Sequence, residues 1–224
     1  MLERVLSSLR GAASIGHIRC VTQPDAFASA FGARATDLAD EIIRPGNGLI
    51  DSLVAGLTGL PGDRLVLVVA TDIPLAAAEH YDAFAHRAAM EDFDVSYGYV
   101  RRETHEAKYP QVRHTWARLR DGTLCGSGVS VIRAAAAGGI AGLLRRVAAA
   151  RKSPLRLASI FSPALVFQYM FGTLTISGVE RRACALAGLR CRGVACDDAG
   201  LAVNVDRLSD LRAVEQILDE REAS

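Results

Sequence analysis

The clearest hydrophobic pattern in the chain is an unbroken apolar run from Leu65 to Ala70. A run that is short and rich in valine predicts a strand covered on both faces, as in a parallel sheet. Pro74 follows soon after, and proline cannot continue a hydrogen-bonded ladder. Asp72 comes just past the predicted end of the strand. Ligands of open α/β sheets bind beyond the carboxyl ends of the strands, so this pattern directs attention to Asp72.

The remaining patterns predict an alternation of strands and helices. Apolar periodicity and composition favour helices at 2–9, 25–31, 49–60, 75–90, 133–151, 179–186 and 211–218, and strands at 17–21, 94–100, 190–195 and 201–205. Such alternation predicts a parallel sheet with helices on both faces. One antiparallel excursion interrupts it, because Asp121-Gly122 separates two strand-like runs, 115–120 and 123–132, and Asp-Gly is typical of a hairpin turn.

The stretch from Leu157 to Val179 contains no charged residue. Its length raises the question of a membrane span, but Pro163, Gly172, Gly178 and several polar residues argue against one. We predict a buried helical hairpin here. The alternative is a surface that contacts a second subunit or a membrane, because exposed apolar patches often mark interfaces.

Composition narrows the class of protein. The chain has 224 residues, half of them hydrophobic, and a net charge of +1, which favours one α/β domain over residues 1–224. A nucleic-acid binder would need a basic excess that is absent. The spacing of Cys191 and Cys196 does not match a zinc site, so we expect the five cysteines to be free thiols in a reducing cytoplasm. The amino-terminal helix lacks the features of a signal peptide.

A second acidic residue, Asp206, ends the predicted strand at 201–205, and Asn204 lies two residues earlier on the same strand face. Two carboxylates and an amide at one sheet edge would suit Mg²⁺, which binds a few protein oxygens together with phosphates and water. The alternative role is helix capping, by Asp72 for a helix starting near Leu75 and by Asp206 or Ser209 for the last helix.

Two further features have a functional and an ordinary interpretation. The turn Pro45-Gly46-Asn47-Gly48 precedes a helix and would let backbone N–H groups approach a ligand, but it lacks the spacing of a phosphate-binding loop and is equally typical of a tight turn. Lys152 lies where a helix must stop, where it would meet phosphate or complement the helix carboxyl terminus. Glu103, Glu106 and Lys108 are expected to lie in a solvated loop, with a role in substrate binding as the alternative. No pair of histidines has metal-site spacing.

The order of these motifs resembles a known family. Leu65-Val-Leu-Val-Val-Ala-Thr-Asp-Ile-Pro-Leu75 resembles the metal-binding strand of the MobA-like nucleotidyltransferases. Further similar segments, in the same order, lie at 48–57, 94–97, 101–103, 109–110, 115–122, 151–157, 179–182 and 203–211. The resemblance covers residues 1 to 218 and implies a three-layer, Rossmann-like fold of GT-A type, with a mostly parallel sheet, an antiparallel hairpin and a helical carboxyl-terminal part.

The resemblance also implies a reaction: Mg²⁺-dependent transfer of a nucleoside monophosphate from a nucleoside triphosphate to a small, phosphorylated acceptor, with release of pyrophosphate. Asp72 would be the main metal ligand, with Asp206 or Asn204 as the second. Nucleotide contacts would fall to Gly46, Gly48 and Thr71, and Lys152 would contact the acceptor phosphate.

The chain departs from the family in two places. The family opens with a strand and a glycine-rich loop that cradles the triphosphate, whereas Met1–Leu6 resembles the helix that follows this loop. We therefore expect either a start that was placed too late or a natural form without the loop, and a sheet lacking that strand would expose unpaired backbone groups. The family's Gly-Gly-Asn reads Gly126-Ser127-Gly128, without the Asn side chain.

These departures leave alternatives open. One is a catalytically impaired relic that binds a nucleotide, or a protein partner through residues 157–179. Another is a glycosyltransferase that uses a nucleotide sugar, because that fold also places an acid after a strand.

Overall fold

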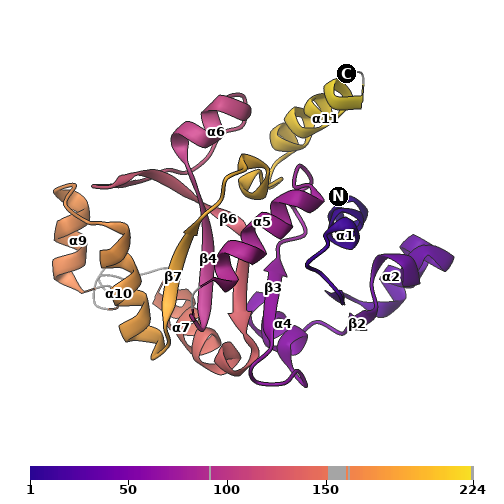
Figure 1. Ribbon diagram of the computed structural model, residues 1–224, viewed down its shortest axis with the longest axis horizontal. Coiled ribbons are helices and arrows are strands. Elements are labelled where there is room, and N and C mark those ends of the chain that lie inside the picture. Colours follow the sequence, from indigo (N-terminus) through magenta and orange to yellow (C-terminus); the bar gives the residue numbers. More distant parts are fainter. Residues whose placement is uncertain (91, 151–159, 161, 223–224) are drawn as a thin grey trace.

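The computed structural model describes residues 1–90, 92–150, 160 and 162–222, and its strands lie in two sheets (Figure 1). In the smaller sheet, β1 (Arg19–Val21) pairs in parallel with β2 (Glu41–Ile43). The larger sheet has the order β3-β6-β4-β7, and β5 also pairs with β6. Its strands are β3 (Leu65–Val69), β4 (Val95–Arg101), β5 (Ala117–Leu119), β6 (Gly122–Arg133) and β7 (Cys191–Ala195).

Strand directions agree with the predicted mostly parallel sheet. Strands β3, β4 and β5 each pair antiparallel with β6, and β4 pairs in parallel with β7. Four strands of this sheet therefore run the same way, and β6 alone runs against them. The Asp121-Gly122 hairpin is also confirmed, since Leu119 pairs with Gly122 at the start of β6.

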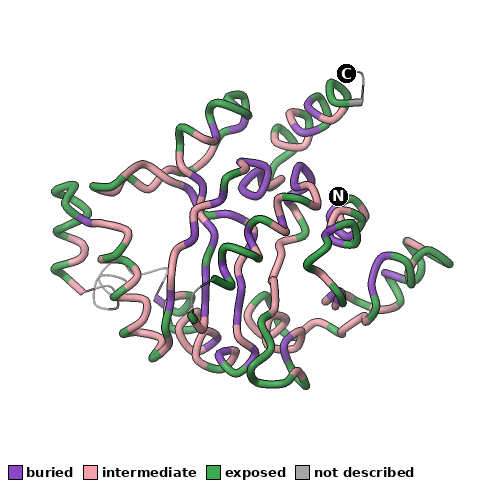
Figure 2. Tube along the Cα trace, viewed as in Figure 1, coloured by how far each residue is buried: buried purple, intermediate pink, exposed green. Residues whose placement is uncertain are grey.

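Helices cover both faces of the larger sheet and give three layers. Their bounds are α1 (Leu2–Gly11), α2 (Pro24–Phe31), α3 (Ala35–Leu38), α4 (Leu49–Leu57), α5 (Ala78–Ala89), α6 (Arg102–Lys108), α7 (Ala137–Ala150), α9 (Pro163–Met170), α10 (Ile176–Ala187) and α11 (Leu208–Glu222), with short 3₁₀ turns η1 (Gly32–Arg34), η2 (Ala134–Ala136) and η3 (Ala199–Ala202). Hydrophobic residues of α4, α7 and α10 form one cluster against the sheet, and those of α1, α5 and η3 belong to a larger one. Figure 2 shows the buried residues along the central strands.

Strand β3 takes part in both clusters, as its apolar run predicts. Val66 and Val68 pack against the cluster of α4 and α7, whereas Leu67 and Val69 pack against the cluster of α1 and α5. Side chains alternate between the two faces of a strand, so only a continuous apolar run satisfies both layers.

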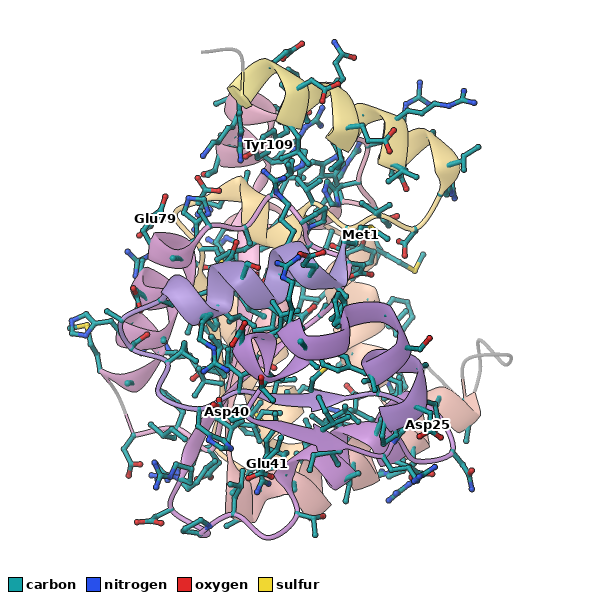
Figure 3. The ribbon with its side chains drawn as sticks, turned by 90° about the vertical axis from the view of Figure 1, so that its right-hand side faces the viewer. Met1, Asp25, Asp40, Glu41, Glu79 and Tyr109 are labelled. Atoms are coloured by element: carbon teal, nitrogen blue, oxygen red, sulfur yellow. The ribbon has the colours of Figure 1, made fainter. Side chains whose placement is uncertain are left out.

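The small sheet is held in place by polar contacts to neighbouring elements. The Asp40 carboxylate accepts hydrogen bonds from the Ile18 N–H at 2.7 Å and from Arg10 of α1 at 3.0 Å. These bonds, the Ile18 bond first, lower the pKa of Asp40. Glu41 forms an ion pair with Arg19 at 3.0 Å, and Figure 3 shows Asp40 and Glu41 close together near β2. The five cysteines are free thiols.

One predicted strand and one predicted loop are wrong. Residues 201–205 do not form a strand: Ala199–Ala202 is a buried 3₁₀ turn that begins where the Gly200 N–H donates to the Asp198 carboxylate. Residues 103–108 are not a solvated loop, because Arg102–Lys108 forms helix α6. An ion pair between Arg102 and Glu106 at i,i+4 spacing supports this helix.

Helix α9, in the uncharged stretch, is not buried, whereas Leu174 in the same stretch exposes only 3% of its surface. No residue of α9 is buried, and Phe167, Met170 and Phe171 expose between 58% and 75% of their surface. Figure 1 shows α9 at the periphery, beside α10. The predicted buried hairpin is therefore wrong for α9, and residues 157–159 and 161 lie outside the described residues. None of the helices described is long and apolar enough to cross a membrane.

Candidate functional site

Asp72 lies in the turn that follows β3, at the carboxyl end of the strand. The last ladder bond joins the Ala70 N–H to the Gly128 carbonyl at 2.8 Å. Asp72 is half-buried, and the segment behind it enters the core, where Ile73 and Leu75 expose at most 1% of their surface. The strand and the buried segment together fix the position of this carboxylate.

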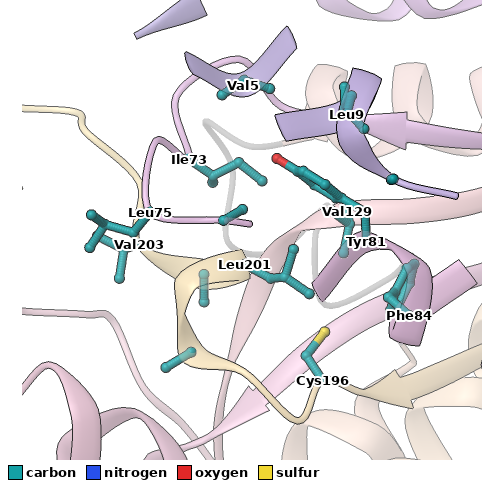
Figure 4. Close-up of a cluster of buried hydrophobic side chains, with 14 of the residues drawn as sticks. Val5, Leu9, Ile73, Leu75, Tyr81, Phe84, Val129, Cys196, Leu201 and Val203 are labelled. Carbon is teal, nitrogen blue, oxygen red and sulfur yellow. The ribbon is translucent and has the colours of Figure 1, made fainter. Parts of the chain in front are cut away.

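Asn204 reaches Asp72 from the other end of the chain. Its Nδ2 donates a hydrogen bond to Asp72 Oδ1 at 3.2 Å, and the Val205 N–H donates to the Asp72 carbonyl at 2.9 Å. Leu201 and Val203, which precede Asn204, are fully buried and pack close to Leu75 in the core (Figure 4). Both segments of the site are thus anchored in the same hydrophobic cluster.

Two glycines allow this close packing. A Cβ at Gly200 would lie 2.7 Å from the Leu75 carbonyl oxygen, and a Cβ at Gly128 would lie 2.7 Å from Ile73 Cγ2. Neither distance is compatible with a side chain unless the neighbouring atoms move. The segments that carry Asp72 and Asn204 therefore depend on glycine at both positions.

Asp206 is exposed and lies two residues beyond Asn204. It does not end a strand, so the predicted arrangement of two strands that each finish in an acid is wrong. Among the described residues its carboxylate has no hydrogen bond or ion pair. Its Cα lies within about 7 Å of the Asn204 Cα, because two residues of extended chain span no more. Asp206 therefore lies near the Asp72–Asn204 pair without a described contact to it.

The capping alternatives do not hold for these acids. Helix α5 begins at Ala78, and there the Ala77 N–H donates to Nδ1 of His80 at 3.1 Å rather than to Asp72. At the start of α11, the N–H groups of Asp206 and Arg207 donate to the Asp210 carboxylate. Asp210 is thus the capping acid, a role that the sequence pattern gave to Asp206 or Ser209.

Histidines 105 and 114 lie close to this region, and no sequence signal pointed to them. Their ring centroids are 4.4 Å apart, and neither ring nitrogen of His105 has a hydrogen-bond partner in the part of the chain described. Burial lowers the pKa of His105 to about 4, so its ring is neutral at pH 7. Burial also lowers the pKa of His114, against the opposing charges of Asp210 and Asp206.

The other predicted residues that the structure describes form no hydrogen bond with Asp72. Gly48 has a φ of 110°, and a Cβ at Gly46 would lie 2.5 Å from Asp51 Cβ, so the turn itself requires both glycines. No hydrogen bond among the described residues joins this turn to Asp72 or Asn204. Thr71 is exposed beside Asp72, and Lys152 lies outside the described residues.

A cavity of about 1460 Å³ lies between β1 and β3, continues along the sheet to residues of β4, β6, β7, α7 and α10, and extends to Thr71 and Asn204. Its walls include apolar side chains of α1 and α4 as well as both strands. The volume exceeds the roughly 300–1,000 Å³ of ordinary small-molecule pockets. Asn204, which donates to Asp72, therefore lines a much larger space, which we call the β1–β3 cavity.

The donor set at this end suits a hard cation. No group of three or more His, Cys, Asp or Glu side chains among the described residues is arranged to hold a metal ion. One carboxylate and one amide, with a second carboxylate nearby, fit Mg²⁺, which takes its remaining ligands from water and phosphate oxygens.

Comparison with known proteins decides the family. Residues 1–147 match the model of the MobA-like NTP transferase domain, which is more than half of the chain. The chain belongs to this family. No curated protein matches it.

Two solved structures have a similar fold. A hypothetical transferase from Thermus thermophilus is 28% identical, with a TM-score of 0.80 over 94% of this chain and 85% of its own. A CMP:2-keto-3-deoxy-manno-octonic acid synthetase in complex with CTP is 12% identical, with a TM-score of 0.61 over 98% of this chain and 88% of its own. At that identity the second likeness shows the fold alone.

Proposed function

We propose that this MobA-like protein transfers a nucleoside monophosphate from a nucleoside triphosphate to a small, phosphorylated acceptor. An anionic oxygen of the acceptor phosphate attacks the α-phosphorus and forms a new P–O bond. The bond from the α-phosphorus to the oxygen that bridges the α- and β-phosphates breaks, and its electron pair leaves with pyrophosphate. Because the attacking oxygen is already anionic, no proton has to be removed from the acceptor. The observation that carries the proposal is the Asp72–Asn204 contact at the carboxyl end of β3 in a chain of this family.

Asp72 and Asn204 would hold Mg²⁺, with Asp206, two residues beyond Asn204, as a further carboxylate. When bound, Mg²⁺ would neutralise the charge that develops on the phosphates. The Asn204 amide keeps the Asp72 carboxylate in one orientation. Thr71, Gly46 and Gly48 are proposed nucleotide contacts, and Lys152 is the proposed contact of the acceptor phosphate.

Thermal unfolding with each nucleoside triphosphate, with and without Mg²⁺, tests this function. Saturation at about 100 times Kd stabilises the folded state by about 2.7 kcal/mol, and in a chain of this size each kcal/mol raises Tm by roughly 2–4 °C. We expect a rise of about 5–10 °C with Mg²⁺ and the preferred nucleotide, and none for Asp72→Ala. Asp63→Ala, which changes an exposed loop carboxylate, is the matched control.

Three outcomes would contradict the proposal. Equal stabilisation of the wild type and Asp72→Ala would show that the nucleotide binds elsewhere. Stabilisation by a nucleotide sugar alone would favour glycosyl transfer. The absence of any shift would favour a relic that binds no nucleotide. Where a shift is found, pyrophosphate release with phosphorylated acceptors distinguishes transfer from binding.

The Asn204→Ala variant tests the role of the amide. It removes the hydrogen bond to Asp72 while leaving the carboxylate in place. Loss of such an orienting partner weakens metal affinity by roughly 10- to 100-fold. We expect the Mg²⁺ concentration needed for half-maximal nucleotide stabilisation to rise by about that factor. An unchanged Mg²⁺ dependence would exclude Asn204 from the site.

A further inference from the structure

One edge of β3 is paired and the other is open. Hydrogen bonds join Ala70 N–H to Gly128 and Ala134 N–H to Arg64, and the pairing register between these bonds is continuous. In an antiparallel pair, residues that exchange hydrogen bonds alternate with residues that do not. Val66 and Val68 therefore bond to β6. The backbone groups of the other three residues, Leu65, Leu67 and Val69, point to the opposite edge.

Strand β1 has an open edge of the same kind. The Ile18 carbonyl accepts from the N–H of Asp40, and the Thr22 N–H donates to the Ile43 carbonyl. The parallel register then directs the backbone groups of Cys20 toward β2, and those of Arg19 and Val21 away from it. No hydrogen bond to the backbone of Arg19 or Val21 is found in the described part of the chain.

The two open edges border the same cavity. Residues 18–21, which contain β1, and residues 65–71, which contain β3, both line the β1–β3 cavity. Val5 and Leu9 of α1 form part of the lining, as do Leu53 and Leu57 of α4. The α1 and α4 residues belong to hydrophobic clusters on opposite faces of β3. The part of the cavity between β1 and β3 is thus bounded by backbone edges in the plane of the sheet and by apolar side chains above and below it.

These boundaries match the chemistry of an extended peptide. A strand offers N–H and C=O groups on both edges, and its side chains alternate between two faces. A strand buried on both faces is apolar throughout, as β3 is. An apolar small molecule would leave the backbone groups of five residues without partners, and burying such groups unpaired costs free energy.

We propose that the β1–β3 cavity binds one extended, apolar polypeptide segment of about five residues, the length of β3. The segment hydrogen bonds to β1 on one edge and to β3 on the other. Its side chains pack alternately against α1 and α4. The bound segment joins the two sheets into one that runs from β2 to β7. Binding by strand addition obtains affinity from main-chain hydrogen bonds and specificity from alternate side chains.

The experiment uses the whole chain and a capped peptide of five valine, leucine or isoleucine residues, flanked by lysines for solubility. Amide hydrogen exchange is measured residue by residue. In the free protein, we expect Leu65, Leu67 and Val69 to exchange roughly 100-fold faster than Val66 and Val68, because only the latter two are hydrogen bonded. The peptide should slow the three fast amides about tenfold or more.

A matched peptide separates strand addition from apolar binding. Methylation of the central backbone nitrogens preserves the side chains but removes the donors, so this peptide should not protect the amides. On the protein, Leu67→Pro removes one N–H that faces the cavity, whereas the residues bonded to β6 remain. Proline is tolerated at such an edge. We expect Leu67→Pro to lose peptide binding and Leu67→Ala to retain it.

Several results would overturn the proposal. Equal protection of the two sets of amides in the free monomer would show that the β3 edge is already closed. Equal binding of the methylated and unmethylated peptides would show that the cavity accepts any apolar ligand. This comparison uses the wild-type protein, so it does not depend on whether Leu67→Pro folds. Protection that depends on protein concentration, together with a dimer in solution, would assign the cavity to a second copy. Asp72→Ala should bind the peptide as the wild type does, so this test is independent of the nucleotide site.

Discussion

The two sides of β3 are built differently, although the strand itself is uniformly apolar. On the β6 side, the ladder ends at Ala70, two residues before Asp72, and the following residues Ile73 and Leu75 are fully buried. On the β1 side, the backbone faces the β1–β3 cavity, and Leu65 exposes 40% of its surface. The position of Asp72 is therefore set by the packed side. A substitution or a bound ligand on the β1 side can therefore change stability or binding without moving the Asp72 carboxylate.

The largest expected effect compares the same substitution on the two sides. Leu75→Ala removes a fully buried side chain and leaves a void, which costs about 3–4 kcal/mol of unfolding free energy. Leu65→Ala removes a side chain that is already partly in contact with solvent, and we expect a loss of about 1 kcal/mol or less. Urea unfolding measures both values.

The comparison fails if the two variants are equally destabilised. That result would mean that Leu65 is buried in solution and that the open edge is covered. An added apolar peptide sharpens the test, because it should increase the cost of Leu65→Ala and leave that of Leu75→Ala unchanged. The slope of unfolding free energy against urea should stay the same in all cases.

The next effect depends on pH and concerns His105, which is also on the packed side. Burial lowers its pKa to about 4, whereas the unfolded ring titrates near 6.5. Between these values the unfolded state binds more protons, so stability falls as the pH falls from 6.5 to 4. The shift corresponds to about 3 kcal/mol. We expect His105→Phe to remove this part of the acid destabilisation, as measured by urea unfolding at pH 7 and pH 4.5.

His86 provides the matched control for that measurement. It is exposed on α5, so His86→Gln should leave the pH dependence unchanged. Some acid sensitivity should remain in His105→Phe, because burial also lowers the pKa values of His80 and His114. If His105→Phe and the wild type lose the same free energy on acidification, the His105 ring is not buried as the neutral form.

The packed side was the more predictable one. The run at 65–70 identified β3 and the position of Asp72, because a strand that contacts helices on both faces must be apolar throughout. Asn204 was also placed at the site, but on the wrong element. Residues 199–203 are apolar because they pack against Leu75, and a buried 3₁₀ turn has no periodicity that separates it from a strand.

The features outside that packed segment were harder to predict. β2 is three residues long and half-buried, too short to show alternation. The sequence of α9 shows that its residues are apolar but not whether anything covers them, and Phe167 and Phe171 are exposed.

The histidines near the site were also beyond prediction from the sequence. His114 is distant from Asp206 and Asp210 along the chain, and only the tertiary fold brings these charges close enough to raise its pKa.

The smallest expected effect concerns the outer end of the site segment. Asp210→Ala removes the acceptor for the N–H groups of Asp206 and Arg207, and loss of such a cap costs about 1 kcal/mol. The cost stays small because Val214 and Ile217 still bury the inner face of α11. The two bonds from residues 204 and 205 to Asp72 are independent of this cap, so nucleotide and Mg²⁺ binding should be retained.

Two further measurements show whether the effect is local. Asp210 raises the pKa of His114, so an NMR titration of Asp210→Ala should show that pKa falling below its wild-type value. Asp219→Ala, an exposed acid near the other end of α11, should change neither the stability nor the titration. If Asp210→Ala abolished the Mg²⁺-dependent nucleotide shift, Asn204 would be held in place by the cap of α11. The packed side of β3 would then not be sufficient to position the site.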